Sequence, residues 1–131
     1  MTEHAYIRSV HNNIKKYHPA VYVWKINDPY QGGVADCYYS AERDMWVEYK
    51  FVPKLPVRPD TPVRIDLSAL QQEWLRARHE QGRNVAVVVG SPDGATILPG
   101  LAWEAGISAA DFRSSMVDKK QVVNYILGQV T

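Results

Sequence analysis

Cysteine is almost absent from this sequence, which contains only Cys37 among 131 residues. An internal disulfide and a zinc site built from several cysteines are therefore excluded. Long apolar runs are missing too, because no stretch approaches the roughly 20 residues that span a bilayer, and no signal-peptide pattern opens the chain. We therefore expect an intracellular, cytoplasmic protein without membrane association, encoded by a cell or by a phage that acts in a host cytoplasm.

The chain also lacks internal repeats, low-complexity segments and a large excess of charge of either sign. Its hydrophobic content of 46% and charged content of 22% are typical of a globular protein, so we expect one domain over residues 1–131. The net charge of +1 is not the strongly basic signature of many nucleic-acid-binding proteins. It does not exclude one, because acidic catalytic residues offset basic contacts and a bound metal restores positive potential.

Two segments rich in Val, Tyr and Trp flank the polar turn at residues 41–44 and predict paired β-strands. Side chains alternate along a strand with period two, so Trp46, Glu48 and Lys50 share one face, with Glu48 and Lys50 about 7 Å apart. If the strands form a hairpin, Asp36 lies beside Glu48 on that face. Two carboxylates and an amine would then meet at one point. Burying such charges in a core without partners has a high free-energy cost.

Carboxylate oxygens are hard ligands that suit Mg²⁺ or Mn²⁺. Such an ion polarises a phosphoryl oxygen and lowers the pKa of a bound water. A lysine beside it can orient that water or stabilise charge on the phosphate. Asp36, Glu48 and Lys50 therefore predict a metal-dependent site for phosphate chemistry. The alternative is an exposed sheet face on which Glu48 and Lys50 are ordinary solvated neighbours.

Apolar residues at helical spacing predict a first helix over residues 3–17, with Thr2 as its N-cap. Glu3 extends the apolar stripe towards the N-terminus and is therefore expected to point inward. We expect the opposite face to be solvated, with phosphate contact as the alternative; it carries Arg8, His11, Lys15 and His18.

A strand is predicted over residues 20–26, followed by a segment at 27–33 that is dense in turn-forming residues. Gly32 and Gly33 would let the backbone approach a ligand closely, or would serve only a tight turn. Residues 84–90 are rich in valine and predict a strand that is buried on both faces.

Prolines at every third position predict an extended loop over residues 53–66. The loop directly follows the strand that holds Glu48, so we expect its base to lie near the site. Its three cations, Lys54, Arg58 and Arg64, are expected to hold a nucleic-acid backbone. A rigid crossover with solvated charges would explain the same residues.

A second helix is predicted to end near Gly82, with a buried stripe formed by Leu67, Leu70, Trp74 and Ala77. Gln71 lies on this stripe, so its amide needs hydrogen-bond partners that a metal-bound water or a phosphate could supply. Residues 91–131 predict a turn, a short edge strand over 95–98 and a final helix, without a chemical constellation. The order helix, three strands, helix, strand indicates an α/β fold around a mixed sheet.

The segment Gly33-Val34-Ala35-Asp36, followed after eleven residues by Glu48-Tyr49-Lys50, resembles the PD-(D/E)XK nuclease superfamily. The resemblance is to its small virus-type replication-repair (VRR-NUC) and Holliday-junction-resolvase-like members. Residues 67–71, Trp74 and Gly82 resemble the element that follows Glu-x-Lys in these nucleases, with Gln71 at the position of their glutamine. Ala35 stands where the superfamily often has a proline, which is not a ligand.

The resemblance covers about residues 3–90 and implies an αβββαβ restriction-endonuclease-like core, in which helices flank a mixed central β-sheet and residues 91–131 form an extension. It implies a Mg²⁺-dependent DNA endonuclease, with Mn²⁺ as the other candidate ion. Asp36, Glu48 and the Tyr49 carbonyl oxygen would bind the ion. Glu3 would complete the site, or would only complement the helix dipole.

In the same resemblance, Lys50 would position or activate the attacking water, and Gln71 would orient that water or the scissile phosphate. In-line attack would leave a 3′-hydroxyl and a 5′-phosphate. A polar residue at the place of Lys25 can meet the substrate in these nucleases.

The implied DNA is a branched or recombination and repair intermediate, while single strands, flaps and duplex stay open. Resolvases and many restriction enzymes of the superfamily act as dimers, so a homodimer is one implied arrangement. The rival from another class is a nucleic-acid-binding or partner-binding module that keeps the fold but cannot cut. Asp36, Glu48 and Lys50 argue against this rival, because a binding module does not need all three.

Overall fold

The computed structural model describes residues 1–28 and 30–131. Pro29, which belongs to the predicted turn at 27–33, lies outside the described residues. The elements follow one another as α1 (Glu3–Tyr17), β1 (Tyr22–Lys25), β2 (Cys37–Ser40), β3 (Asp44–Phe51), α2 (Ala69–Glu80), β4 (Val85–Ser91), β5 (Gly94–Pro99), the short 3₁₀ helix η1 (Ala102–Ala105), α3 (Ala109–Ser115) and α4 (Lys119–Val130).

The five strands form a mixed sheet in the order β1-β2-β3-β4-β5. The pairs β1–β2, β2–β3 and β4–β5 are antiparallel, whereas β3 and β4 run parallel. Parallel neighbours need a crossover connection, and here the proline-rich loop and α2 provide it. This arrangement confirms the predicted α/β fold with its αβββαβ order, and β5 then adds the second edge of the sheet.

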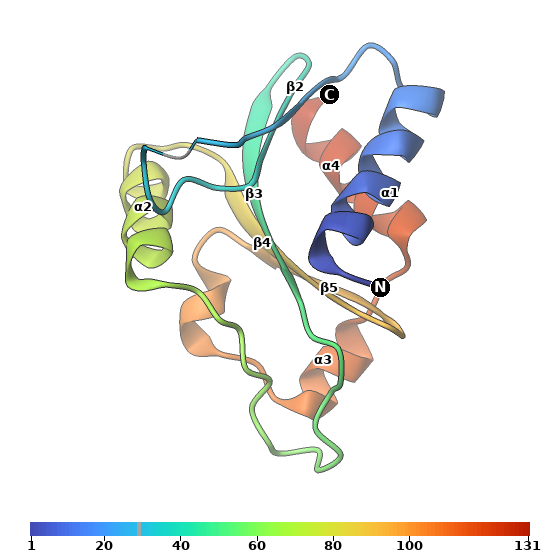
Figure 1. Ribbon diagram of the computed structural model, residues 1–131, viewed down its shortest axis with the longest axis vertical. Coiled ribbons are helices and arrows are strands. Elements are labelled where there is room, and N and C mark those ends of the chain that lie inside the picture. The colour runs from blue at the N-terminus through green and yellow to red at the C-terminus, as the bar shows by residue number, and fades with distance from the viewer. Residues whose placement is uncertain (29) are drawn as a thin grey trace.

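Helices cover both faces of the sheet (Figure 1). On one face, α1 and α4 enclose a cluster that includes Val10, Val47 and Ile126. On the other face, α2, η1 and α3 enclose a second cluster that includes Leu75, Val87 and Phe112. Every residue of β4 is buried, which confirms the prediction of a strand that is covered on both faces. The predicted edge strand and final helix correspond to β5 and α4.

The register of β2 and β3 confirms the predicted hairpin. Cys37 pairs with Val47 and Tyr38 pairs with Trp46. Continuing this antiparallel register by one residue brings Asp36, just before β2, opposite Glu48. Because opposite residues of an antiparallel pair share one face, the two carboxylates are brought together by the register itself.

The first helix begins as predicted, since the Thr2 hydroxyl accepts a hydrogen bond from the Ala5 amide at 3.1 Å. The expectation that the face of Arg8 and His11 is solvated is wrong for His11, whose exposed fraction is 7%. The His11 Nε2 atom lies 2.7 Å from the Tyr39 hydroxyl, which is in turn 2.7 Å from the Tyr49 hydroxyl. An imidazole can be buried at low cost when distant residues provide such a partner, and helical spacing alone does not reveal one.

The second helix also departs from the predicted stripe. Leu70 is 55% exposed, whereas Leu75 is buried and contacts the core. Leu67 and Trp74 of the predicted stripe pack against this cluster, whereas Leu70 faces the turn before β2. Gly33 adopts a φ of +88°, and a Cβ at this position would collide with the Leu70 carbonyl group. Close packing of the turn against α2 thus explains this glycine without a ligand.

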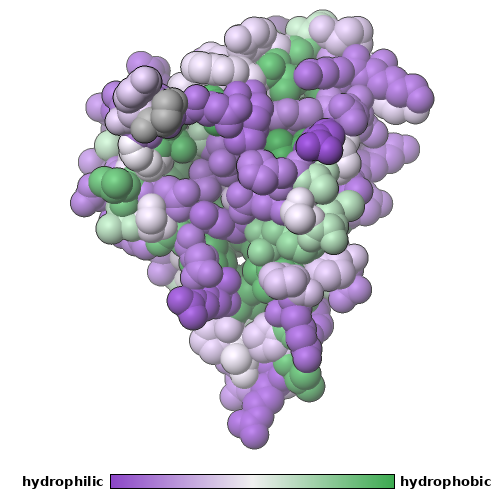
Figure 2. Space-filling view, in the orientation of Figure 1, coloured by the Kyte–Doolittle hydropathy of each residue, from purple (hydrophilic) through white to green (hydrophobic). Residues whose placement is uncertain are grey.

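The proline-rich loop forms the narrow lower end of the molecule in Figure 1, and Figure 2 shows hydrophilic side chains at its tip. It is fixed to the segment around α3. The Val63 amide donates to the Ile107 carbonyl at 2.8 Å, and the Arg113 guanidinium donates to the Pro56 carbonyl at 2.7 Å. The loop is therefore a tethered crossover over most of its length. Within the described residues, no helix has the length and apolar composition needed to cross a membrane.

Candidate active site

The carboxylates of Asp36 and Glu48 each accept a hydrogen bond from a backbone amide at or next to the other residue. The Asp36 amide donates a hydrogen bond to Glu48 Oε1 at 3.2 Å, and the Tyr49 amide donates to Asp36 Oδ2 at 2.9 Å. Glu48 is almost fully buried, with an exposed fraction of 1%, while the Asp36 side chain is 21% exposed. The pair therefore has one deep carboxylate and one that faces solvent.

Lys50 and Gln71 meet the second oxygen of Glu48. The Lys50 Nζ atom lies 3.4 Å from Glu48 Oε2, and Gln71 Nε2 donates to the same oxygen at 3.0 Å. The structure thus brings together the four residues that sequence analysis selected as catalytic. Lys50 comes from the same face of β3 as Glu48, as the period-two pattern predicts.

The N-terminus of α2 fixes the orientation of Gln71. Its Oε1 atom accepts a hydrogen bond from the Ser68 amide, and the Ser68 hydroxyl accepts one from the Gln71 amide. This reciprocal capping box occupies the carbonyl end of the side chain, so the amino end is directed to Glu48. The same Gln71 side chain therefore caps α2 and contacts Glu48.

Lys25 is the second cation of the site. Its Nζ atom lies 3.7 Å from Asp36 Oδ1 and 3.4 Å from the Ile26 carbonyl oxygen. The pair is partly exposed, so it adds little to the free energy of folding. The position next to the outer carboxylate agrees with the expectation that Lys25 meets a substrate, which stays a prediction.

The carboxylates influence one another electrostatically. Burial, followed by the charge of Asp36, raises the pKa of Glu48 to about 8, while Lys50 opposes this shift. Burial and then Asp36 also raise the pKa of Glu3, which places the start of α1 within the field of the pair. A positive ion at this point would relieve the repulsion between the carboxylates.

The oxygen donors of Asp36 and Glu48 suit Mg²⁺ or Mn²⁺, and their repulsion fits a cation between them. Among the described residues, no three His, Cys, Asp or Glu side chains are grouped closely enough to hold a metal. An ion would therefore depend on two side chains, with further ligands from the backbone or water. The roles of Glu3 and of the Tyr49 carbonyl oxygen as ligands stay predictions.

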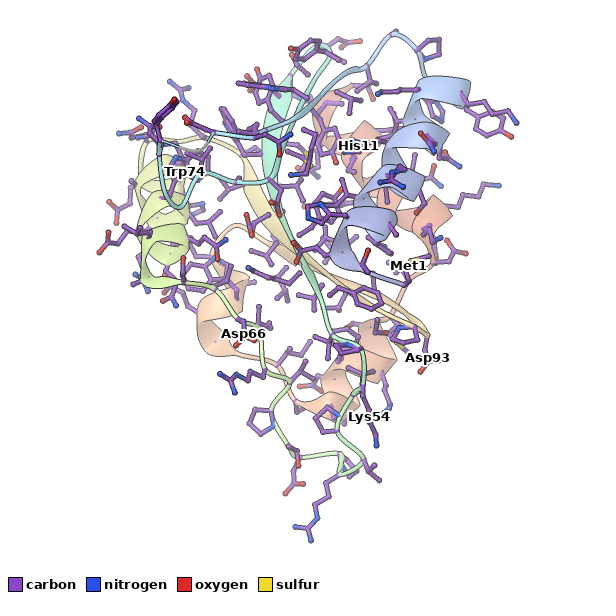
Figure 3. All side chains as sticks on the ribbon, viewed as in Figure 1. Met1, His11, Lys54, Asp66, Trp74 and Asp93 are labelled. Carbon is purple, nitrogen blue, oxygen red and sulfur yellow. The ribbon has the colours of Figure 1, made fainter. Side chains whose placement is uncertain are left out.

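The cations of the proline-rich loop lie outside this network. Figure 3 shows Lys54 at the lower end of the molecule, far from Trp74 on α2. Arg64 pairs with Asp66 at 2.8 Å, and both side chains are exposed. No hydrogen bond or ion pair in the described part of the chain joins Lys54, Arg58 or Arg64 to the acid pair, and their contact with nucleic acid stays a prediction.

Sequence analysis missed a cavity of about 710 Å³ next to the acid pair. Trp24, Trp46 and Trp74 line it, together with Lys25 and Arg78. The sequence does contain a sign of this cavity, because aromatic residues occupy alternate positions of two predicted strands. This sign could not be used, because only the strand register and the place of α2 bring these rings to one spot.

Comparison with known proteins supports the fold. No protein-family model matches the chain, and no curated protein matches it in sequence. Among solved structures, the fold is similar to that of Hjc, a Holliday junction resolvase from the archaeal hyperthermophile Archaeoglobus fulgidus. The TM-score is 0.52 at 13% sequence identity, over 90% of this chain and 98% of that chain. This similarity confirms, for the fold, the predicted resemblance to resolvase-like PD-(D/E)XK proteins.

Proposed function

We propose that this protein is a metal-dependent endonuclease that hydrolyses phosphodiester bonds in DNA. The observation that carries the proposal is the convergence of Asp36, Glu48, Lys50 and Gln71 within hydrogen-bonding and ion-pair distance, in a fold similar to a resolvase. The nuclease domain would comprise residues 1–131, because β5 and α4 complete the sheet and its core.

Asp36 and Glu48 would hold the divalent ion, with the Tyr49 carbonyl oxygen as a further ligand, and Glu3 would add its negative charge from the start of α1. A bound Mg²⁺ or Mn²⁺ polarises a phosphoryl oxygen and lowers the pKa of water. Lys50, fixed beside Glu48, would orient the attacking water and stabilise negative charge on the phosphate. Gln71 would keep Glu48 oriented and donate a hydrogen bond to the water or the phosphate. Lys25 would attract the DNA phosphates to the site beside Asp36.

The name of the similar protein describes it as a Holliday junction resolvase. Branched DNA, such as a recombination or repair intermediate, is therefore the first substrate to test. Cutting two strands of a junction needs two active sites, so we also propose a homodimer on that substrate.

A catalytically silent binding module with the same fold is the alternative. One observation favours it, because both oxygens of Glu48 already have donors in the Asp36 amide, Gln71 and Lys50. A satisfied polar network can be structural, and binding of a metal would have to displace or share these contacts.

The test combines cutting with metal binding. Supercoiled plasmid, a four-way junction and single-stranded DNA are incubated with Mg²⁺, Mn²⁺ or chelator, and Mn²⁺ binding is followed by calorimetry. Glu48→Gln should abolish cutting and weaken Mn²⁺ binding while the protein stays folded. Glu104→Gln is the matched control, since Glu104 is a glutamate paired with Arg76 outside the site. If Glu48→Gln cuts as the wild type does, the site assignment is wrong.

A further inference from the structure

The cavity beside the acid pair is built from aromatic side chains of three elements. Trp24 comes from β1, Trp46 from β3 and Trp74 from α2, and Figure 3 shows Trp74 near the segment that joins β1 to β2. The volume of about 710 Å³ is within the range of small-molecule sites in proteins. The cavity is therefore large enough for a flat ring system.

The sheet register aligns these aromatic rings in one row. Trp24 pairs with Tyr38, and Tyr38 pairs with Trp46 on the next strand. The ring centroids of Tyr38 and Trp46 are 4.6 Å apart, and those of Trp46 and Trp74 are 5.3 Å apart. Trp24 ends the row and is 46% exposed, although burial of its ring would be favourable. The row thus offers an open aromatic surface at its outer end.

Two cations line the same cavity. The Arg78 guanidinium lies 5.8 Å from the centre of the Trp74 ring. Its Nε atom is buried, and nothing in the described part of the chain accepts a hydrogen bond from it. Buried donors are nearly always satisfied in native proteins, so water or a ligand has to supply the missing acceptor. The Asp28 carboxylate, which also lines the cavity, already accepts bonds from the Tyr30 and Gln31 amides.

The cavity and the acid pair are immediate neighbours. Trp46 precedes Glu48 by two residues on the same face of β3, which corresponds to about 7 Å. Lys25 lines the cavity and also pairs with Asp36. Trp74 follows Gln71 by three residues on α2, so both project from one side of the helix. A ligand in the cavity would be next to any phosphate that a metal ion holds at the two carboxylates.

We propose that this cavity binds an unpaired nucleobase of the strand whose phosphate lies at Asp36 and Glu48. This inference rests on the proposed function and narrows its substrate. A nucleobase is a flat ring that stacks on tryptophan and offers acceptors to Arg78, while the adjoining phosphates match the charge of Lys25. Bases of an intact duplex are stacked inside it, so the preferred substrate has an unpaired base beside the cut, as single strands and branch points do.

Binding without cutting tests the inference. Single-stranded oligonucleotides that contain the fluorescent base 2-aminopurine, and a fully paired duplex, are titrated with the full chain in chelator and in Ca²⁺. Stacking should quench the fluorescence of the wild-type complex. Trp24→Ala should weaken single-strand binding about 5- to 100-fold, remove the quenching and leave duplex binding unchanged. Arg78→Gln should weaken single-strand binding as well.

Tyr17→Ala is the matched control, because Tyr17 is an exposed aromatic residue on α1 that does not line this cavity. Single-strand binding that is absent in the wild type, or equal in Trp24→Ala, overturns the inference. Sedimentation is measured in parallel. If the wild type is a dimer, Trp24→Ala is a monomer and DNA binding is unchanged, the surface binds a second copy of the chain and the inference is overturned.

The experiments distinguish failure of the nuclease proposal from failure of the base-binding proposal. If the wild type cuts DNA and Trp24→Ala keeps the same preference among substrates, the nuclease proposal stands and the base-binding cavity is wrong. If no DNA is cut with either metal but Trp24→Ala loses single-strand binding, the cavity stands and the cutting chemistry is wrong.

Discussion

The two faces of β3 each carry a polar network, and only one of them contains carboxylates and lysines. On the side of α1 and α4, His11, Tyr39 and Tyr49 form a chain of contacts of 2.7 Å each. On the side of α2, Asp36 and Glu48 are linked through the Asp36 and Tyr49 backbone amides and to neighbouring cations. The first network is enclosed by core residues, whereas the second borders a cavity.

This difference indicates which face would be stabilised by a bound cation. Burial lowers the pKa of His11 to about 4, so the imidazole is neutral at pH 7 and its hydrogen bond to Tyr39 satisfies it. Burial and Asp36 raise the pKa of Glu48 to about 8, so the fold opposes the ionised form that a metal needs. The polar groups of the neutral network satisfy one another, whereas a cation would reduce the repulsion between the carboxylates of the charged network.

A large loss of cutting is expected from removing the amine of the charged network. Lys50→Ala should lower the rate of DNA cutting about 100- to 1000-fold, because charge on the phosphate loses its stabilising group. Single-turnover cutting of the best wild-type substrate measures this, with DNA binding and the melting temperature measured in parallel. Lys16→Ala removes the same charge from an exposed site on α1 and should cut normally. Equal rates for both variants would remove Lys50 from the mechanism.

The neutral network should respond in stability and not in activity. Tyr39→Phe leaves His11 and Tyr49 without their shared partner and should lower the free energy of unfolding by about 1–3 kcal/mol. Urea denaturation measures this change. Tyr38→Phe, on the same strand, loses a hydroxyl that bonds the exposed Asp44 and should cost less. A large loss of cutting in folded Tyr39→Phe would contradict the separation of the two faces.

The two networks should also differ in the sign of their pH dependence without metal. The pKa of His11 falls from 6.5 to about 4 on folding, so this group makes the protein more stable as the pH rises from 4 to 6.5. The pKa of Glu48 rises from 4.5 to about 8, so this group makes the protein less stable as the pH rises from 4.5 to 8.

The opposing effects overlap below pH 6.5, so the wild type should lose stability mainly between pH 6.5 and 8. Urea denaturation in chelator at several pH values measures the profile. Glu48→Gln should remove the loss above pH 6.5, and Mn²⁺ should do the same in the wild type by binding the ionised carboxylate. A profile that is the same in Glu48→Gln would show that Glu48 does not titrate in this range.

The smallest effect is expected in the proline-rich loop. If Lys54 and Arg58 contact phosphates, replacing both with alanine should reduce the salt dependence of DNA binding by about one unit of slope per contact. Arg64 is left in place because it pairs with Asp66. An unchanged slope would leave the loop as a crossover that is tethered to the segment around α3.

Much of the charged network could be predicted from the sequence, because it depends on local rules. Period-two alternation places Glu48 and Lys50 on one face, and the short turn at 41–44 sets the hairpin that brings Asp36 opposite Glu48. The distance from this strand to α2 does not follow from a local rule. Gln71 was selected through the resemblance to a nuclease family and through the need of its amide for partners.

Other features depended on partners far away in the sequence. Helical spacing predicts a solvated His11, and this is wrong because the hydroxyl that satisfies the buried imidazole comes from Tyr39, 28 residues later. Helical spacing also predicts a buried Leu70, but Leu75 fills the core and Leu70 packs against the turn at Gly33. Helical spacing identifies an apolar stripe, but tertiary packing decides which part of it is covered.

The sequence by itself determined the strands, the pairing of the two acids and the presence of the second helix, because alternation, turn length and helical spacing act over a few residues. Only the tertiary structure decided that Gln71 reaches Glu48, that Lys25 meets Asp36 and that three tryptophans line one cavity. These contacts join β1, β3 and α2, whose relative placement depends on the packing of the whole core.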